Sequence, residues 1–90
     1  MSIFPFSRFE VSDNSMEPFL RQDDHVVTFN WSKPKKNEVI VFTSDGKYFV
    51  KRVDRILKNQ FFVSGDNRQM SSKLDPIGRK QIVGKVIIKY

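Results

Sequence analysis

The chain has 90 residues, which are enough for one small domain (residues 1–90) and not for a second. Its net charge is +6, from 16 Lys and Arg against 10 Asp and Glu, and it contains no cysteine and one histidine. These counts exclude disulfides, thiolate metal sites and cysteine nucleophiles, and they argue against histidine-based triads and multi-histidine metal centres. Any hydrolytic chemistry therefore needs a lysine or a carboxylate as its base, and we expect neither a metal nor another cofactor.

The positive charge suits binding to nucleic acid or to an anionic membrane surface. The basic residues are spread along the chain, however, with the densest group at Lys33, Lys35 and Lys36, which favours a solvated basic surface. No apolar run approaches the roughly 20 residues of a membrane-spanning helix. The start of the chain is apolar but short, is interrupted by Pro5 and lacks a basic leader, so it predicts neither a signal peptide nor an anchor. We therefore expect a cytoplasmic protein.

Short runs of β-branched and aromatic residues, separated by turn residues, predict strands along most of the chain. Ser44-Asp45-Gly46 predicts a hairpin turn with Gly46 at positive φ, and Leu57-Lys58-Asn59 predicts a second turn. Residues 67–78 are expected to be irregular. The predicted fold class is mostly β, a small antiparallel β-barrel or folded sheet. Its predicted strands span residues 8–11, 25–30, 38–43, 47–56, 60–64 and 82–89.

The stretch Asp13-Asn14-Ser15-Met16-Glu17-Pro18 places a hydroxyl group in a turn. Asp13 and Asn14 tolerate tight turns, and Pro18 fixes its own φ and favours an extended Glu17. Ser15 is therefore predicted to lie in a defined loop. Serines in turns usually cap or bond the local backbone, so this stretch alone does not make Ser15 a nucleophile.

Lys51 stands on a predicted strand between two apolar residues of the same face, because side chains at alternate positions of a strand point the same way. These neighbours are Phe49 and Val53. Burying a charged lysine is costly, so the pKa of Lys51 should fall below the ordinary lysine value and leave an amine that can accept a proton. Periodicity alone favours the other possibility, in which Lys51 lies at the rim and extends its ammonium into water.

A third stretch, Val63-Ser64-Gly65-Asp66-Asn67-Arg68, ends a predicted strand with strong turn residues. Together the three stretches resemble the type I signal peptidase family of serine proteases, which use a Ser-Lys dyad. Ser15-Met16-Glu17-Pro18 with Leu20 is similar to the family's nucleophile motif Ser-Met-x-Pro-Thr-Leu, and Lys51-Arg52-Val53 to its general-base motif Lys-Arg-Val. Gly65-Asp66-Asn67-Arg68 with Ser71 is similar to the opening of its Gly-Asp-Asn-Arg-x-x-Ser motif, and Ile82-Val83-Gly84-Lys85 to its closing Val-Gly-Lys segment.

The resemblance implies a role for each matching residue. Ser15 would be the nucleophile, and its backbone N–H would donate to the oxyanion. Lys51 would be the general base and later return its proton to the leaving amine. Ser71 would hydrogen-bond the Lys51 amine and orient it. The remaining supporting residues are Met16 and Pro18, which would shape the turn and the floor of the cleft, and Asp66 and Asn67 of the third stretch.

The resemblance also implies the partner. A protein or peptide substrate would bind as an extended strand and be cut at small residues in a signal- or propeptide-like extension. Nucleic acid is not expected to bind, and the oligomeric state is left open. Family members normally carry a membrane helix and a second β-region, whereas here about a dozen residues separate Lys51 from Gly65. A similarly short, anchorless branch is thought to mature nickel superoxide dismutase by removing a propeptide, and this chain is similar to that branch.

Two departures from the family pattern concern charge. Lys73 takes a position that is usually acidic and Asp75 one that is usually basic, which predicts an ion pair with exchanged partners. Asp13 stands where the family often has Gly or Ser. A carboxylate would repel an oxyanion, so we expect Asp13 to point away from the site.

Three other possibilities remain. The related self-cleaving repressors share the dyad and a similar fold, but we see no DNA-binding domain in this sequence. A second possibility is a degenerate protease fold that has lost its activity, which the exchanged charges at Lys73 and Asp75 suggest. A small basic β-barrel could also bind single-stranded nucleic acid through surface aromatics, although we expect most of these residues to be core. The aromatics concerned are Phe29, Trp31, Phe42 and Tyr48.

Four phenylalanines lie near the Ser15 stretch in the sequence, namely Phe4, Phe6, Phe9 and Phe19. We expect them to belong to the core. The alternative is an apolar lip that contacts substrate or makes a peripheral contact with a membrane.

Overall fold

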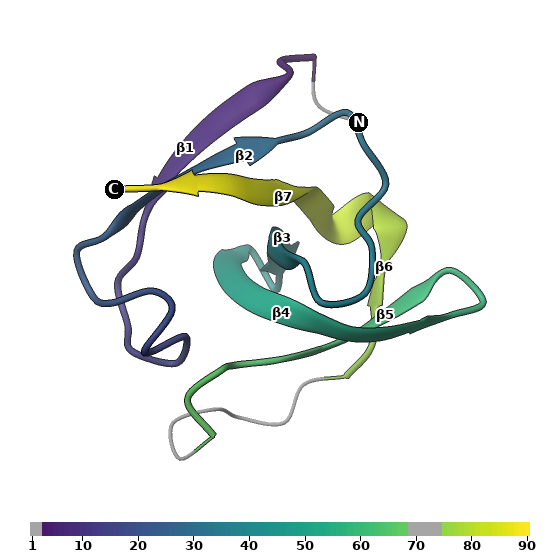
Figure 1. Cartoon of the computed structure of the whole chain (residues 1–90). Helices are drawn as coiled ribbons and strands as arrows, with labels where there is room; N and C mark the ends of the chain where they lie inside the picture. Colours follow the sequence, from purple (N-terminus) through teal and green to yellow (C-terminus); the bar gives the residue numbers. More distant parts are fainter. Residues whose placement is uncertain (1–2, 69–74) are drawn as a thin grey trace.

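The computed structural model describes residues 3–68 and 75–90, which form seven strands and a single 3₁₀ turn (Figure 1). Within these residues no helix is long and apolar enough to cross a bilayer. The elements are β1 (Phe6–Glu10), β2 (His25–Phe29), β3 (Val39–Ser44), β4 (Lys47–Leu57), β5 (Gln60–Ser64), β6 (Ile77–Gly78), η1 (Arg79–Gln81) and β7 (Ile82–Lys89).

All seven strands belong to one antiparallel sheet with the order β1-β2-β7-β3-β4-β5-β6. The last strand, β7, lies between β2 and β3 and so joins the β1–β2 pair to the other four strands of the sheet (Figure 1). The sheet folds over without closing into a barrel. The predicted mostly β fold is confirmed, in its folded-sheet form.

Both predicted turns are confirmed. Asp45 and Gly46 have φ values of 52° and 77° and connect β3 to β4. Lys58 and Asn59 have φ values of 50° and 65° and connect β4 to β5. Two successive residues with positive φ are what a tight two-residue hairpin requires, because this backbone matches the twist of the flanking strands.

Strand β3 separates two hydrophobic clusters, because its alternate side chains point to opposite sides of the sheet. Val39 and Val41 belong to the first cluster, whereas Ile40 and Phe42 belong to the second. The first cluster lies under the Ser15 loop and the second lies between β4, β5 and β6. The first also contains Val11, Met16, Leu20 and Val26, and the second also contains Val53, Phe61, Val63 and Ile77.

Gly84, in the closing segment of the family pattern, lies where β7 passes close to β2. A Cβ atom at this position would meet the Asn30 side chain, and it would lie 2.8 Å from the carbonyl oxygen of Phe29. Backbone atoms cannot give way as a flexible side chain does. Gly84 is therefore required by the close approach of β7 to the end of β2.

The expectation of an aromatic core is only partly met. Phe4 and Phe6 are 64% and 54% exposed, so their assignment to the core is wrong, whereas Phe9 and Phe19 pack against the first cluster. Phe6 is exposed because it lies on the outer face of β1, an edge strand with alternating burial.

The four aromatics considered as nucleic-acid contacts differ in burial. Phe42 is buried and Phe29 is half-buried. Trp31 and Tyr48 are 56% and 64% exposed, against our expectation of core.

Candidate active site

Lys51 lies in the middle of β4 and is only 6% exposed. Its Nζ donates a hydrogen bond to Ser15 Oγ over 2.7 Å. Burial lowers the pKa of Lys51 below the ordinary lysine value, because the ammonium loses hydration, and the nearby Asp13 carboxylate opposes part of this shift. The rim position that periodicity favoured is wrong, and the predicted burial of Lys51 on the same side as Val53 is confirmed.

Ser15 is 4% exposed and lies in the loop between β1 and β2. The next residue, Met16, and Leu20 are fully buried in the first cluster. Each buried side chain of this size contributes about 1.5–3 kcal/mol, which holds the loop against the sheet. Two backbone hydrogen bonds, from Glu17 N to Asn14 O and from Leu20 N to Met16 O, shape the turn. The predicted defined loop is confirmed.

The two motif residues on either side of Glu17 have different surroundings. Met16 is buried beneath the loop, so it supports Ser15 from the core. Pro18 is exposed, and the peptide bond that precedes it is cis. The expectation that they shape the turn stays a prediction, and neither of them lines the cleft described below.

The turn Gly65-Asp66-Asn67 makes hydrogen bonds both to the Ser15 loop and to strand β4. The Asn67 backbone N–H donates to Ser15 O over 2.8 Å, and Asn67 Nδ2 donates to Asn14 O over 3.1 Å. Asp66 accepts two hydrogen bonds of 2.8 Å from Arg52, the residue that follows Lys51 on β4. This bidentate contact raises the pKa of Arg52. Asp66 and Asn67 therefore hold the two elements that carry Lys51 and Ser15 in fixed relation.

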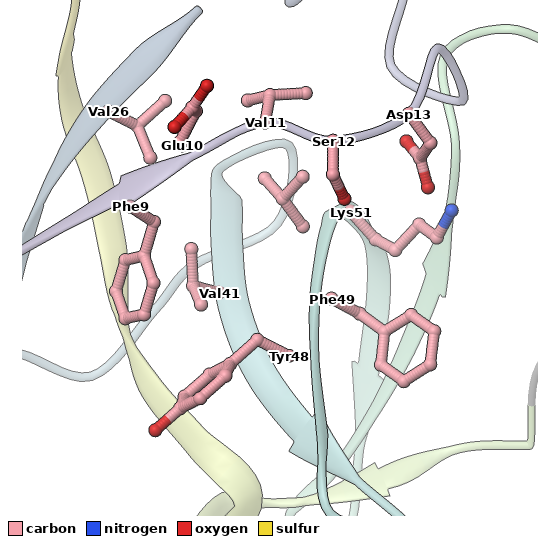
Figure 2. Close-up of a pocket in the computed structure, with 11 residues that line it drawn as sticks. Phe9, Glu10, Val11, Ser12, Asp13, Val26, Val41, Tyr48, Phe49 and Lys51 are labelled. Carbon is pink, nitrogen blue, oxygen red and sulfur yellow. The ribbon is translucent and has the colours of Figure 1, made fainter. Parts of the chain in front are cut away.

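Asp13 points toward the site, so the expectation that it points away is wrong. Its Oδ1 accepts hydrogen bonds from the Ser15 backbone N–H over 3.2 Å and from Ser15 Oγ over 3.1 Å. Figure 2 shows the carboxylate on the same side as the Lys51 amine. Aspartate side chains commonly accept a hydrogen bond from the backbone two residues on, and this local preference sets the orientation.

An open cleft runs from the end of β1 to Lys51 (Figure 2). The Phe9 and Tyr48 rings, whose centroids are 5.2 Å apart, lie together at the end far from Lys51. The cleft walls are mainly apolar, and its charged groups are two carboxylates and the Lys51 amine. The lining residues are Phe9, Glu10, Val11, Ser12, Asp13, Val26, Val41, Tyr48, Phe49, Val50 and Lys51.

Some predicted residues cannot be placed. Ser71 and Lys73 lie outside the described residues, so the proposed orientation of Lys51 by Ser71 and the exchanged ion pair stay predictions. Asp75 is described and exposed. The sequence interpretation missed the contact of Arg52 with Asp66 and the inward turn of Asp13. The spacing Asp13-x-Ser15 was the available signal for the second of these.

A buried lysine in hydrogen-bond contact with a serine, on a β scaffold, is an arrangement found in serine peptidases that work without histidine. A family model described as Peptidase S24-like matches residues 7–87. The chain therefore belongs to the Peptidase S24-like family, which supports peptidase activity of the serine type. No curated protein matches the chain. The predicted protease class is confirmed at this level, whereas the type I signal peptidase branch is not distinguished.

Proposed function

We propose that this protein is a serine endopeptidase in which Ser15 and Lys51 form a catalytic dyad. The observation that carries the proposal is the 2.7 Å contact between Lys51 Nζ and Ser15 Oγ at a buried position. A structural lysine would be expected to reach solvent or a carboxylate. Here the amine contacts a hydroxyl group, which a neutral lysine can deprotonate.

In the proposed reaction, neutral Lys51 takes the hydroxyl proton as Ser15 Oγ attacks the scissile carbonyl carbon. The Ser15 backbone N–H donates to the oxyanion, and protonated Lys51 then transfers its proton to the leaving amine. Water attacks the resulting acyl-enzyme with Lys51 again as base. Because only the neutral amine starts this sequence, activity should rise with pH through the lowered pKa of Lys51.

The substrate we propose is a signal- or propeptide-like extension in an extended conformation. The open, mainly apolar cleft beside Lys51 supports binding of a peptide there. Cleavage at small residues follows from the resemblance to signal peptidases. The short interval between Lys51 and Gly65, similar to the branch thought to mature nickel superoxide dismutase, favours propeptide removal as the form of the reaction.

The test is cleavage of propeptide-like peptides with small residues flanking the cut. The wild type would be compared with Ser15→Ala and Lys51→Ala, with Ser44→Ala and Lys47→Ala as controls at the far end of the β3–β4 hairpin. We expect both dyad variants to lose activity and both controls to keep it. Activity that survives in either dyad variant contradicts the proposal, and a folded, inactive wild type with an ordinary Lys51 pKa favours the degenerate fold.

A further inference from the structure

A single carboxylate oxygen engages two of the groups that the proposed reaction needs. Asp13 Oδ1 lies 3.2 Å from the Ser15 backbone nitrogen, whose N–H would stabilise the oxyanion. The same oxygen lies 3.1 Å from Ser15 Oγ, whose proton Lys51 would remove. Asp13 thus occupies both of these donors before a substrate arrives.

The hydroxyl group of Ser15 has one proton, so it cannot donate to Asp13 and to Lys51 at the same time. In the structure Lys51 Nζ donates to Ser15 Oγ, and Ser15 Oγ donates to Asp13 Oδ1. With this direction of donation the hydroxyl proton faces Asp13 and not the lone pair of a neutral Lys51 amine, so Lys51 cannot take it. Attack requires the hydroxyl proton to turn toward Lys51 and the Ser15 N–H to be vacated, because an oxyanion and a carboxylate at one donor would repel each other.

We propose that Asp13 is an inhibitory latch on the nucleophile loop, which the substrate displaces when its scissile carbonyl reaches the Ser15 N–H. The inference rests on the proposed Ser-Lys function and deepens it. Asp13 is exposed and forms no ion pair within the described residues, so its side chain can swing into solvent at little cost. A peptidase closed in this way spares proteins that do not seat firmly in the cleft.

The charged groups around the latch are few within the described part of the chain. Lys51 faces Asp13 from β4, and Glu10 lines the same cleft from the end of β1. Tyr48 is the remaining titratable side chain of the cleft. The next cation on β4, Arg52, is turned toward Asp66. Removing the Asp13 charge should therefore act mainly on Lys51 and favour its neutral form.

The test compares kcat/KM across pH for the wild type, Asp13→Ala and Asp13→Asn. Alanine removes both the charge and the acceptor, whereas asparagine keeps an acceptor oxygen without the charge. We expect Asp13→Ala to raise kcat/KM near neutral pH by about threefold to tenfold, the equivalent of one hydrogen bond released. Both variants should move the rising limb of the profile to lower pH. Asp45→Asn, in the β3–β4 hairpin turn and outside the cleft, is the control carboxylate and should leave the profile unchanged.

A purely structural role for Asp13 gives the opposite result. If the Asp13 side chain only shapes the loop, Asp13→Ala lowers kcat/KM and leaves the pH limb in place, and this outcome overturns the latch. Asp13→Ser, which keeps a small polar group, provides a second variant if the alanine protein does not fold. Thermal unfolding of each variant separates loss of the loop from loss of the latch.

A measurement that needs no substrate cleavage tests the Asp13 latch independently of the proposed peptidase activity. The Lys51 side chain and the Ser15 amide would be followed by NMR in the wild type and in Asp13→Ala. We expect the Lys51 titration to move to lower pH and the Ser15 amide resonance to shift in the variant. If no variant cleaves any peptide, the proposed function fails, and unchanged NMR signals overturn the latch independently.

Discussion

Lys51 and Arg52 are adjacent on strand β4, but they differ in burial, in hydrogen-bond partner and in the direction of their pKa shifts. Lys51 is buried against Ser15, and the loss of hydration lowers its pKa. Arg52 points to the other face, where it donates two hydrogen bonds to the Asp66 carboxylate, and this contact raises its pKa. Because side chains alternate along a strand, the buried Lys51 amine and the Arg52–Asp66 ion pair lie on opposite faces of β4. The difference shows that adjacent cations on one strand acquire opposite pKa shifts because different groups face them.

The largest expected effect comes from making the two cations alike. Lys51→Arg keeps the positive charge but cannot lose a proton at any pH the protein survives. We expect kcat/KM to fall by about a hundredfold to ten-thousandfold, as for the loss of a general base. The measurement is steady-state cleavage, with circular dichroism as a check on the fold. An arginine variant that retains substantial activity contradicts proton transfer by Lys51.

The second prediction concerns the ion pair. Asp66→Asn removes the charge that Arg52 binds and weakens both hydrogen bonds. Because these side chains are 31% and 21% exposed, we expect a loss of only about 1–2 kcal/mol in the free energy of unfolding. Denaturant unfolding measures this loss, and it should be accompanied by a lower kcat because Asp66 holds the turn that contacts Ser15. Arg52→Lys should reproduce the effect, since lysine lacks the bidentate geometry. Unchanged stability in both variants would show that the turn is held by other contacts.

The third prediction concerns how the lowered pKa of Lys51 makes the stability of the protein depend on pH. With a folded pKa below the unfolded value, Lys51 binds fewer protons when folded, so its contribution to stability rises with pH between the two values. Lys51→Met removes this dependence. The variant should be more stable than the wild type near neutral pH by about 1 kcal/mol, and the advantage should disappear above the unfolded pKa. Urea unfolding at several pH values gives the difference, in which the other titrating groups largely cancel. A difference that stays constant with pH would mean that Lys51 has an ordinary pKa.

The smallest effect is expected at the contact between the Gly65-Asp66-Asn67 turn and the Ser15 loop. Asn67→Ala removes the side-chain hydrogen bond to Asn14 O but leaves the backbone bond to Ser15 O. We expect a loss of about 0.5–1.5 kcal/mol in unfolding free energy and a kcat reduced by a few fold. Asn59→Ala, in the distant β4–β5 turn, controls for general destabilisation. If the two variants match in kcat at equal stability, Asn67 does not position Ser15.

Local chemistry made much of the fold predictable. Predicted strands 60–64 and 82–89 have the observed bounds, and Asp45-Gly46 and Lys58-Asn59 form the hairpin turns that their residue types favour. The two-residue strand β6 was missed within the stretch predicted to be irregular. It owes its existence to pairing with Gln60 and Phe61, a long-range contact that a short sequence window does not contain.

The candidate site was predictable in its members and less so in its geometry. The alternation of side chains along the strand correctly placed Lys51 on the same face as Val53. It could not predict how deeply Lys51 is buried, because the burial depends on the neighbouring strand β3 and on the Ser15 loop, which contacts the Lys51 amine. Motif spacing gave no sign that Arg52 and Asp66 pair. Asp13 points inward because its carboxylate accepts a hydrogen bond from the Ser15 backbone N–H, two residues further along the chain. The sequence prediction gave more weight to the repulsion between a carboxylate and an oxyanion, and so it was wrong for this residue.

The central claim is that Lys51 can lose its proton within reach of Ser15. Titration of the Lys51 side chain by NMR tests it most directly. We predict that Lys51 titrates clearly below the ordinary lysine value in the wild type, because burial lowers its pKa. If Lys51 titrates at the ordinary lysine value, the amine is an ammonium at working pH, and the Ser-Lys dyad is contradicted.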